Sequence, residues 1–287
     1  MFAICTYPNE LSDFLWYVCY LTNGKHLSFY LAFVKVIGLL ILAAPAALFL
    51  GFVVAVGSRS KIFSINVLGN FFIIIVRGIP DIAWFLFFVI ALDQAFETVR
   101  HIGFCPDWQE KIRQGSNFVV CQDAKLPRGD AADWLHEMYA FLLAIITFSI
   151  VFGAFCANVI KGAMEAVPKS QLETAAAFGM KQDKIFWRIL VPQMWRFALP
   201  GLANVWMILI KATPLLFLLG IEDIVYWARE LGGTKTPRFT SYPHGDWRIW
   251  YFSVLMIFYL LITQISEHYL KKISNHFSKG LHQNDSL

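Results

Sequence analysis

Four long apolar runs dominate the chain. They cover residues 29–56, 138–160, 197–221 and 249–266, and each contains at most one charged residue. A helix that crosses a bilayer needs about 20 mainly apolar residues. A buried helix of a soluble protein is the alternative for any single run, but four such runs in one chain favour membrane spans.

A fifth apolar region, residues 62–92, is interrupted by Arg77, Gly78, Pro80 and Asp81. The 15 uncharged residues before the break and the 11 after it are each short for a crossing. The region therefore either crosses once with a kink at the break, or forms a hairpin of two short pieces.

The charges between the runs favour one crossing. Loops on the cytoplasmic side of a membrane carry an excess of Lys and Arg. Such an excess occurs in residues 57–64, 161–196 and 271–287, whereas residues 93–137 hold eight acids and five bases. An odd number of crossings must therefore separate 57–64 from 93–137, and we expect one, with the kink toward the cytoplasmic side. This gives five spans, with the N-terminus outside, loop 222–247 outside and the C-terminus inside.

Composition agrees with a membrane protein and excludes other classes. Of the 287 residues, 57% are hydrophobic and 15% are charged, and the mean hydropathy is +0.56. An average soluble domain has about 25% charged residues. Disordered chains and nucleic-acid-binding domains need charge at higher density. We therefore expect an all-α protein of the lipid bilayer, with no nucleic-acid partner.

The N-terminal segment, residues 1–27, precedes the first run and is expected outside the membrane or at its surface. It lacks the basic region of a secretory signal, and it contains Glu10 and Asp13. Trp16 and Tyr20 favour a short helix at the headgroup level. A loosely ordered terminus is an equally good interpretation.

The five cysteines include no C-x-x-C pair of the kind that binds zinc or exchanges electrons. Cys105 and Cys121 both lie in the region that we expect outside. In an oxidising compartment, a disulfide between them would close a loop of roughly 17 residues and contribute about 3 kcal/mol. We favour this bridge over two unpaired thiols.

The longest basic stretch on the expected inside has the pattern of a short surface helix. Ser170 and Glu173 match the S-x-x-E capping box, which predicts a helix over residues 171–187. Its early face holds small residues, among them Ala175 and Gly179, which allow another surface to approach the backbone. Such a helix between two spans suits docking to a cytoplasmic partner. An amphipathic connector on the headgroups is the alternative.

The same stretch carries a pattern with fixed offsets, namely Glu173-Thr174-Ala175, then Gly179, then Ile189 and Val191-Pro192. It resembles the EAA loop of ABC-importer membrane subunits, in which E-A-A, Gly and I-x-L-P follow one another. Pro192 is expected to end the helix before the next span. Four further segments resemble motifs of the polar amino-acid permeases: residues 76–80 (R-G-T-P), 166–173 (A-V-P-x-G-Q-x-E), 192–200 (P-Q-x-x-R-x-A-L-P) and 211–215 (K-D-T-S-L).

The resemblance covers roughly residues 28–270 and is closest to the histidine and opine permease subunits. It implies the type I ABC-importer permease fold in a bacterial inner membrane, with an extended periplasmic loop at 93–137, a coupling loop at 168–190 and a cytoplasmic tail at 271–287. It also implies a second permease subunit, identical or homologous, a cytoplasmic ATPase dimer and a periplasmic amino-acid-binding protein. Whether the solute is histidine, another basic amino acid or an opine stays open.

The resemblance assigns the ATPase-coupling site to Glu173, Thr174, Ala175, Gly179, Ile189 and Pro192. No G-x-x-x-x-G-K-[ST], H-E-x-x-H or G-x-S-x-G motif occurs in the sequence. We therefore expect a transport subunit with no catalytic residues, no cofactor and no metal, whose partner hydrolyses ATP.

Charged residues within the apolar runs are expected to be functional unless they form ion pairs or are exposed to water. Lys35 lies near the end of its run, and we interpret it as structural, with its ammonium group reaching outward. Arg77 and Asp81 are four residues apart and are expected to form a local pair. The kink between them, with Gly78 and Pro80, is expected to act as a hinge or gate.

Lys211 lies in the middle of its run with no acid within four residues, so it must pair with another span or face water. We expect it to line the transport pathway together with Thr213 of the same motif, where a fixed cation suits a carboxylate. Pro214 replaces the usual Ser or Ala and is expected to kink the span, because it removes the bond to the Ile210 carbonyl.

Two other classes of protein compete with this interpretation. A stand-alone secondary transporter needs acidic or His relays within its spans, and Asp81 is the one candidate. The other class is a membrane-embedded enzyme or a purely structural subunit, and an enzyme needs clustered His, Cys or carboxylates. His101 and His136 are 35 residues apart with no ligand pattern, so solvated histidines explain them better.

Overall fold

The computed structural model describes residues 5, 12–108, 111–238 and 240–278 of the chain. Most of the N-terminal segment before Ser12 and the tail beyond residue 278 therefore lie outside the described residues. The elements are α1 (Asp13–Leu21), α2 (Gly24–Gly57), α3 (Phe63–Gly78), α4 (Asp81–Phe104), β1 (Arg113–Gln114), β2 (Asn117–Phe118), η3 (Gln122–Ala124), α5 (Asp133–Ala166), α6 (Lys169–Ala177), α7 (Gln182–Ile185), η4 (Phe186–Leu190), α8 (Val191–Ala212), η5 (Thr213–Leu219), α9 (Ile224–Gly232) and α10 (Arg248–Ser278).

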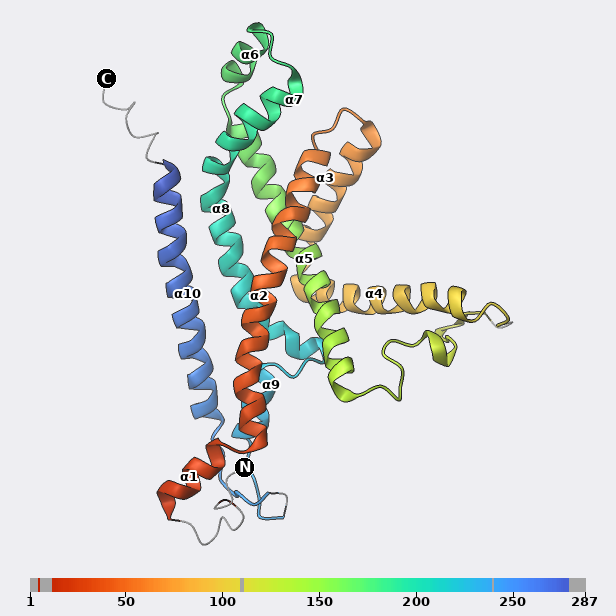
Figure 1. Cartoon of the computed structure of the whole chain (residues 1–287), viewed down its shortest axis with the longest axis vertical. Coiled ribbons are helices and arrows are strands. Elements are labelled where there is room, and N and C mark those ends of the chain that lie inside the picture. The colour runs from red at the N-terminus through yellow and green to blue at the C-terminus, as the bar shows by residue number, and fades with distance from the viewer. Residues whose placement is uncertain (1–4, 6–11, 109–110, 239, 279–287) are drawn as a thin grey trace.

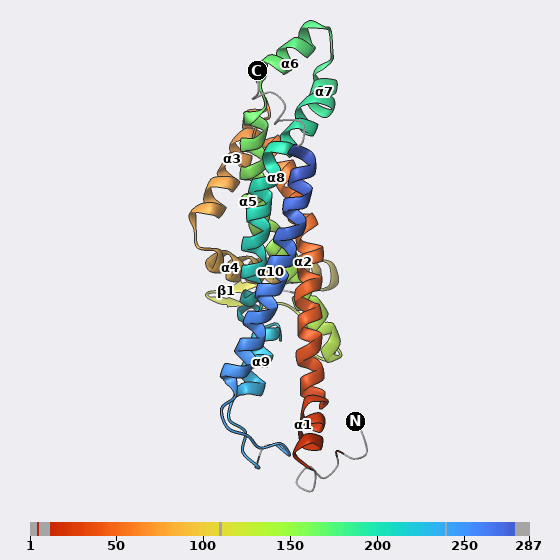
Figure 2. The same ribbon diagram turned by 90° about the vertical axis from the view of Figure 1, so that its left-hand side faces the viewer.

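Among the described residues, five helical stretches are long and apolar enough to cross a membrane, which is the number that the sequence predicts. They are α2, α4, α5, the run Gln182–Leu219 that includes α8, and α10. Helices α2, α5 and α8 pack along the long axis of the molecule, and α10 stands beside them (Figures 1 and 2). Most of the buried apolar side chains belong to one cluster that these helices form.

The α2–α5 contact is the most extensive between two helices, and glycines make it possible. A Cβ atom on Gly51 would lie 2.4 Å from the Cβ of Cys156 and 3.0 Å from the carbonyl oxygen of Gly153. The chain therefore has no room for a larger residue at this crossing. Small residues of this kind let membrane helices approach closely, where packing replaces the hydrophobic driving force that lipid removes.

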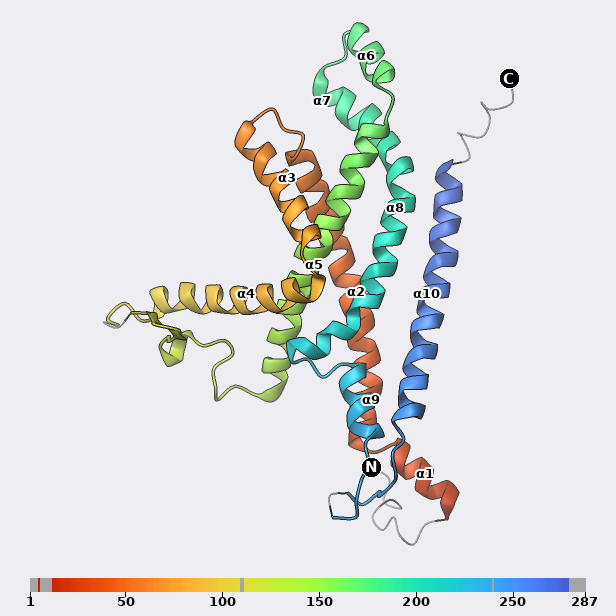
Figure 3. The ribbon, with the colours of Figure 1, turned by 180° about the vertical axis from the view of Figure 1, so that it is seen from behind.

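The broken region 62–92 forms two helices, α3 and α4, that meet at Ile79 and Pro80. Helix α3 returns along α5, whereas α4 turns away across the long axis of the bundle, so the two do not form a hairpin (Figures 1 and 3). The 16 residues of α3 span about 24 Å. The break thus lies far along the helix from the α2–α3 turn, and the prediction of a kink close to the inside loop is wrong.

Amide side chains fix the turn between α2 and α3. The amide nitrogens of Asn66 and Asn70 both donate to the carbonyl oxygen of Ser58, at 2.6 Å and 3.1 Å. The ammonium group of Lys161 in α5 donates to Oδ1 of Asn70 at 2.6 Å. The two amides satisfy the Ser58 carbonyl oxygen, which has no helical partner at the end of α2. The bond from Lys161 ties α3 to α5 near the coupling loop.

The two ends of the molecule carry different elements. Helices α6 and α7 and the C-terminal end of α10 lie at one end, and α1 lies at the other (Figure 1). Helix α1 forms over Asp13–Leu21, so the loosely ordered interpretation is wrong for these residues. A disulfide between Cys5 and Cys19 joins this helix to the segment before it. The sequence analysis did not pair these two cysteines.

The expected long loop 93–137 is shorter in the structure, because α4 continues to Phe104 and α5 begins at Asp133. The connection contains the β1–β2 hairpin and a disulfide between Cys105 and Cys121. The backbone N–H of Cys121 donates to Nδ1 of His101 at 3.0 Å. These contacts join the end of α4 to the middle of the α4–α5 connection. The connection is therefore a compact module.

Candidate functional site

The predicted coupling loop projects beyond the ends of α5 and α8 as two short helices, α6 and α7 (Figure 1). Glu173 and Thr174 lie exposed on α6, and Gly179 lies exposed in the turn that follows. Ala175 is only 7% exposed and faces the protein's own interior. The small-residue face that the sequence predicted for a partner is therefore partly used within the chain, which leaves the Glu173 side of α6 free.

The capping box predicted from Ser170 and Glu173 does not form. Helix α6 begins at Lys169 with Pro168 at its N-cap, and no side chain caps it. Ser170 is already inside the helix, where its carbonyl oxygen accepts a hydrogen bond of 2.7 Å from the Thr174 hydroxyl. Proline, with its fixed φ and no N–H, starts a helix without a capping side chain. Pro168 therefore sets the start of α6, and the S-x-x-E spacing of Ser170 and Glu173 does not.

The predicted continuous helix 171–187 is also wrong, because α6 ends at Ala177. Gly179 adopts φ +77°. Its N–H donates to the Ala176 carbonyl at 2.9 Å, and the N–H of Met180 donates to the Ala175 carbonyl at 3.1 Å. These two bonds form the Schellman turn that closes helices, and it requires a left-handed residue that glycine adopts without strain. The structure therefore explains why the motif has glycine at position 179: the turn that closes α6 needs a left-handed residue there.

Pro192 does not end a helix, contrary to the prediction. It lies in the first turn of α8, and a π-helical segment, η4, joins α7 to α8 in one helical run. A proline cannot donate to the carbonyl four residues earlier, and a π-turn relieves that loss locally. Ile189 is half-buried within this segment. The run therefore connects the coupling loop rigidly to the α8 span.

Two exposed aromatic residues that were not predicted from the sequence lie in the coupling segment, Phe178 before the Gly179 turn and Trp187 in η4. Phe178, which directly precedes Gly179, is 85% exposed, and Trp187 is 59% exposed. Exposed aromatic side chains are the usual anchors of protein interfaces. The position of Phe178 directly before Gly179 is the sequence signal that could have identified it, whereas Trp187 lies in η4 with its ring 6.0 Å from that of Phe52.

The predicted gate residues lie at the break between α3 and α4. Arg77 is exposed in the last turn of α3, and Asp81 is half-buried in the first turn of α4. Because the helix stops at Gly78 and restarts after Pro80, no local pair forms between the two charges, and that prediction is wrong. Helix α4 packs against η5, so the break and the segment that begins at Thr213 belong to contacting elements.

A polar groove runs between α8 and α10. Two adjoining cavities of about 480 Å³ and 350 Å³ share Lys211 and Thr263 as lining residues. Lys211 is exposed, and it forms no ion pair or hydrogen bond with any described residue. Other polar side chains along the groove include Asn204, Gln264, Ser274 and the ion pair of Glu267 with Lys271. Lys211 therefore opens onto a groove between two spans, and its place on the pathway stays a prediction.

Thr213 lies fully buried where α8 becomes the 3-10 helix η5. Its hydroxyl group lies 3.0 Å from the Ile210 carbonyl oxygen and 2.9 Å from the hydroxyl of Tyr259 in α10. The change of helix type occurs at Pro214, as the missing N–H predicts. Thr213 thus joins the two helices that form the groove instead of lining it.

Two further charged groups hold neighbouring elements. The Lys35 ammonium lies 2.6 Å from a carboxylate oxygen of Glu137, which links α2 to α5 beside a cavity of about 820 Å³. Asp223 is fully buried and caps α9 by accepting the backbone N–H groups of Val225 and Tyr226 at 3.0 Å and 2.9 Å. Burial raises the pKa of Asp223 to about 6. Lys35 is structural in this arrangement, as we interpreted it.

Comparison with known proteins agrees with this architecture. The family of binding-protein-dependent transport system inner membrane components matches residues 47–272. The arginine ABC transporter permease protein ArtQ of Escherichia coli is 30% identical over 237 residues, which cover 83% of this chain and 89% of that protein. The histidine/lysine/arginine/ornithine transport system permease protein HisQ of the same organism is 30% identical over 212 residues, 74% and 76% of the two chains.

A crystal structure of an amino acid ABC transporter with histidines has the same fold. It matches with a TM-score of 0.61 over 93% of this chain and 99% of that chain, at 18% identity. The nopaline transport system permease protein NocQ of Agrobacterium fabrum is 26% identical over 77% of this chain and 79% of its own length.

The chain belongs to the family of inner-membrane components of binding-protein-dependent transport systems. It is a multi-pass permease subunit of an ABC importer, and the prediction of a transport subunit instead of an enzyme is confirmed by this membership. The family works with an ATPase and a binding protein. No comparison supports the stand-alone secondary transporter.

Proposed function

We propose that the chain pairs with a second permease subunit to form the membrane pathway for a basic amino acid or an opine, and that an ATPase dimer drives it by docking on α6 and the Gly179 turn. The observation that carries this proposal is the coupling loop. Glu173 and the Gly179 turn project from the end of the molecule, and the helical run that begins at Gln182 after this turn continues into α8, which lines the groove. A push on α6 would therefore pass through the Gly179 turn to a run that reaches the groove.

We infer that the α6–α7 end faces the cytoplasm and α1 faces the periplasm. The excess of bases in residues 57–64 and 161–196 supports this orientation. The two disulfides support it as well, because they occur away from the α6–α7 end, and disulfides persist in oxidising compartments. The N-terminus is then outside and the C-terminus inside.

The solute class follows from the relatives and from the groove. The named relatives carry arginine, the group histidine, lysine, arginine and ornithine, or nopaline. The groove holds the cation Lys211, which suits a solute carboxylate, whereas the carboxylate of Glu267 already pairs with Lys271 at 2.6 Å. Competition of labelled arginine uptake by a panel of amino acids and opines identifies the preferred solute. Failure of every basic amino acid and opine to compete would exclude this class.

Replacement of Lys211 by methionine is expected to lower uptake about tenfold or more, because a charge-assisted hydrogen bond to the solute carboxylate is lost. Membrane insertion and binding of the ATPase should be unchanged, since Lys211 has no partner among the described residues. Lys111→Met, at an exposed site in the α4–α5 connection, is the matched control and should keep full uptake. Normal uptake by Lys211→Met would remove this residue from the pathway.

A further inference from the structure

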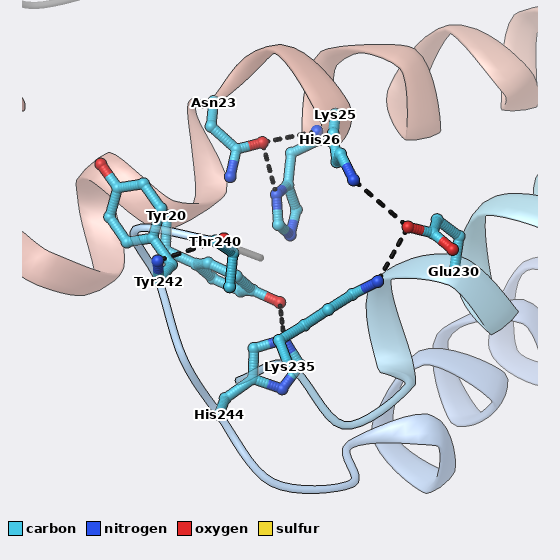
Figure 4. A network of polar contacts seen from close by, with 9 residues as sticks. All are labelled: Tyr20, Asn23, Lys25, His26, Glu230, Lys235, Thr240, Tyr242 and His244. Carbon is cyan, nitrogen blue, oxygen red and sulfur yellow. Dashed lines mark hydrogen bonds and ion pairs between the residues drawn. The ribbon is translucent and has the colours of Figure 1, made fainter. Parts of the chain in front are cut away.

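Four side chains form a continuous line of hydrogen bonds at the end of the molecule opposite α6 and α7, and we call them the histidine–tyrosine network. They are Tyr20 of α1, His26 of α2, His244 of the loop before α10, and Tyr251 of α10. The hydroxyl of Tyr251 lies 2.6 Å from Nε2 of His26 and 2.9 Å from the hydroxyl of Tyr20. The Tyr20 hydroxyl lies 3.1 Å from Nε2 of His244 (Figure 4).

Both ends of the network meet atoms that only accept hydrogen bonds. Nδ1 of His244 lies 2.7 Å from the carbonyl oxygen of Gly245. Nδ1 of His26 lies 3.0 Å from Oδ1 of Asn23 (Figure 4). The same Oδ1 accepts the backbone N–H of His26 at 2.9 Å, which fixes the orientation of the Asn23 amide. Each Nδ1 atom must therefore carry a proton.

The network has five contacts and needs five protons, because each contact requires one. Two neutral imidazoles and two phenols supply four, since each ring carries one N–H or one O–H. Burial raises the pKa of Tyr20, so its phenol keeps its proton. With four protons, one of the five contacts has no hydrogen, and two lone pairs then face each other there. All five hydrogen bonds form only when one additional proton is present, and the network is then a cation.

The additional proton belongs on His244. His26 is 1% exposed and has no ion-pair partner among the described residues, so a charge there carries the full cost of burial. The ring of His244 is half-buried and stacks on Trp247, with centroids 4.2 Å apart and planes inclined by 10°. This geometry stabilises a cation over an aromatic face. His244 then donates at both ring nitrogens, to Gly245 and to Tyr20, and the donors from Tyr20 onward all point toward His26 and Asn23.

The charged groups around the network are paired with one another. A carboxylate oxygen of Glu230 lies 3.2 Å from the ammonium of Lys25 and 2.8 Å from that of Lys235 (Figure 4). Asp246 pairs with Arg248. The hydrogen bond from Lys235 lowers the pKa of Glu230, so this carboxylate stays ionised and does not supply the proton. Among the described residues, Tyr30 and Tyr242 also contact rings of the network, and Tyr17 stacks on Trp247 beside it.

We propose that the histidine–tyrosine network is a proton-binding site, which takes up one proton from the surrounding water as it closes and then fastens α1 and α2 to the loop before α10. Histidine is the side chain that titrates in the range where such uptake occurs, near pH 6.5. The closed network binds the proton and the open one releases it. Closure is therefore favoured as the pH falls through this range and is lost as the pH rises.

The consequence for transport rests on the proposed function. If this end of the molecule faces the periplasm, the network controls the surface at which a binding protein delivers its solute. Protonation would make the loop 233–247 rigid, and loss of the proton would release it from α1. Delivery would then respond to the pH of the outer compartment.

Amide hydrogen exchange of the purified chain in nanodiscs tests the proton site without any transport assay. After correction for the intrinsic exchange rate, protection of residues 240–251 should rise about fivefold between pH 8 and pH 5.5, the equilibrium factor of one additional hydrogen bond. In Tyr251→Phe, three contacts remain and the neutral side chains supply three protons, so protection should not change with pH. Tyr30→Phe, which removes a phenol outside the network, should behave as wild type.

Two results would overturn the proposal. One is protection of the wild-type chain that does not change with pH. The other is a pH dependence in Tyr251→Phe equal to that of the wild type, which would mean that the pH dependence does not come from the complete network. Tyr20→Phe also removes the need for an additional proton while it keeps both histidines. If Tyr251→Phe does not fold, Tyr20→Phe can be compared with the wild type in its place.

Discussion

The variant Gly179→Ala is expected to insert into the membrane normally and to lose about nine-tenths of its ATP-driven uptake and of its bound ATPase. Gly179 has φ +77°, and a side chain in this left-handed region costs roughly 1–2 kcal/mol, which corresponds to about a tenfold change in an equilibrium. The Schellman turn that ends α6 would open, and Glu173 and Phe178 would no longer be presented together. Co-purification with the ATPase and uptake into vesicles measure the two losses.

Gly162→Ala is the matched control for this experiment. Gly162 lies exposed in α5 near the same end of the molecule, and a Cβ atom there meets nothing within 4 Å. Alanine is the better helix former, so this variant should keep full activity. If Gly179→Ala also kept its ATPase and its uptake, the glycine turn would have no part in docking.

The variant Gly51→Ala is expected to lower the stability of the whole bundle. The new Cβ atom would lie 2.4 Å from the Cβ of Cys156 and 2.9 Å from the backbone nitrogen of Ala157. Neither atom is the end of a flexible side chain, so α2 and α5 must separate. Overpacking of this kind typically costs about 1–3 kcal/mol. A lower midpoint of thermal aggregation in detergent, measured by size-exclusion chromatography, would show it.

The same substitution at Gly38, in the same helix, provides the comparison. A Cβ atom there would meet Phe141 at 3.8 Å, an ordinary contact, so Gly38→Ala should have a wild-type midpoint. Equal midpoints for Gly51→Ala and Gly38→Ala would show that the α2–α5 crossing tolerates a wider spacing.

Hydrophobic length and motif spacing predict much of the fold and of the coupling site. The runs that became α2, α5, α8 and α10 are local properties of the chain, and a membrane requires them. The motif residues from Glu173 to Gly179 likewise lie on one protruding segment, whereas Ile189 lies in η4 and Pro192 in α8, and their part in coupling stays a prediction. Both kinds of signal are contained within short stretches of sequence.

Local signals failed where two of them competed. The spacing of Ser170 and Glu173 fits a capping box, but Pro168 begins the helix first. The four-residue spacing of Arg77 and Asp81 fits a helical pair, but Pro80 ends the helix between them. Spacing rules apply only within a continuous helix. Pro168 and Pro80 fix where the helices begin and end at these two sites.

Contacts between distant parts of the chain had no local signal. Tyr20 and His26 meet residues more than 220 positions away in the sequence. Cys5 and Cys19 lie in one segment that the charge pattern placed outside, and that shared compartment was the available hint for their disulfide. The histidine–tyrosine network depends on the packing of α1 against the loop before α10, which no spacing within one element encodes.

The central claim is that ATP hydrolysis by an ATPase docked on the coupling loop drives uptake, and reconstitution tests it most directly. Proteoliposomes that contain the chain, its ATPase and the second permease subunit, supplied with the binding protein and labelled arginine, should accumulate solute only with ATP inside and ATPase present. Glu173→Ala should reduce that accumulation. Uptake that persists without the ATPase, driven by an ion or proton gradient, would contradict the account.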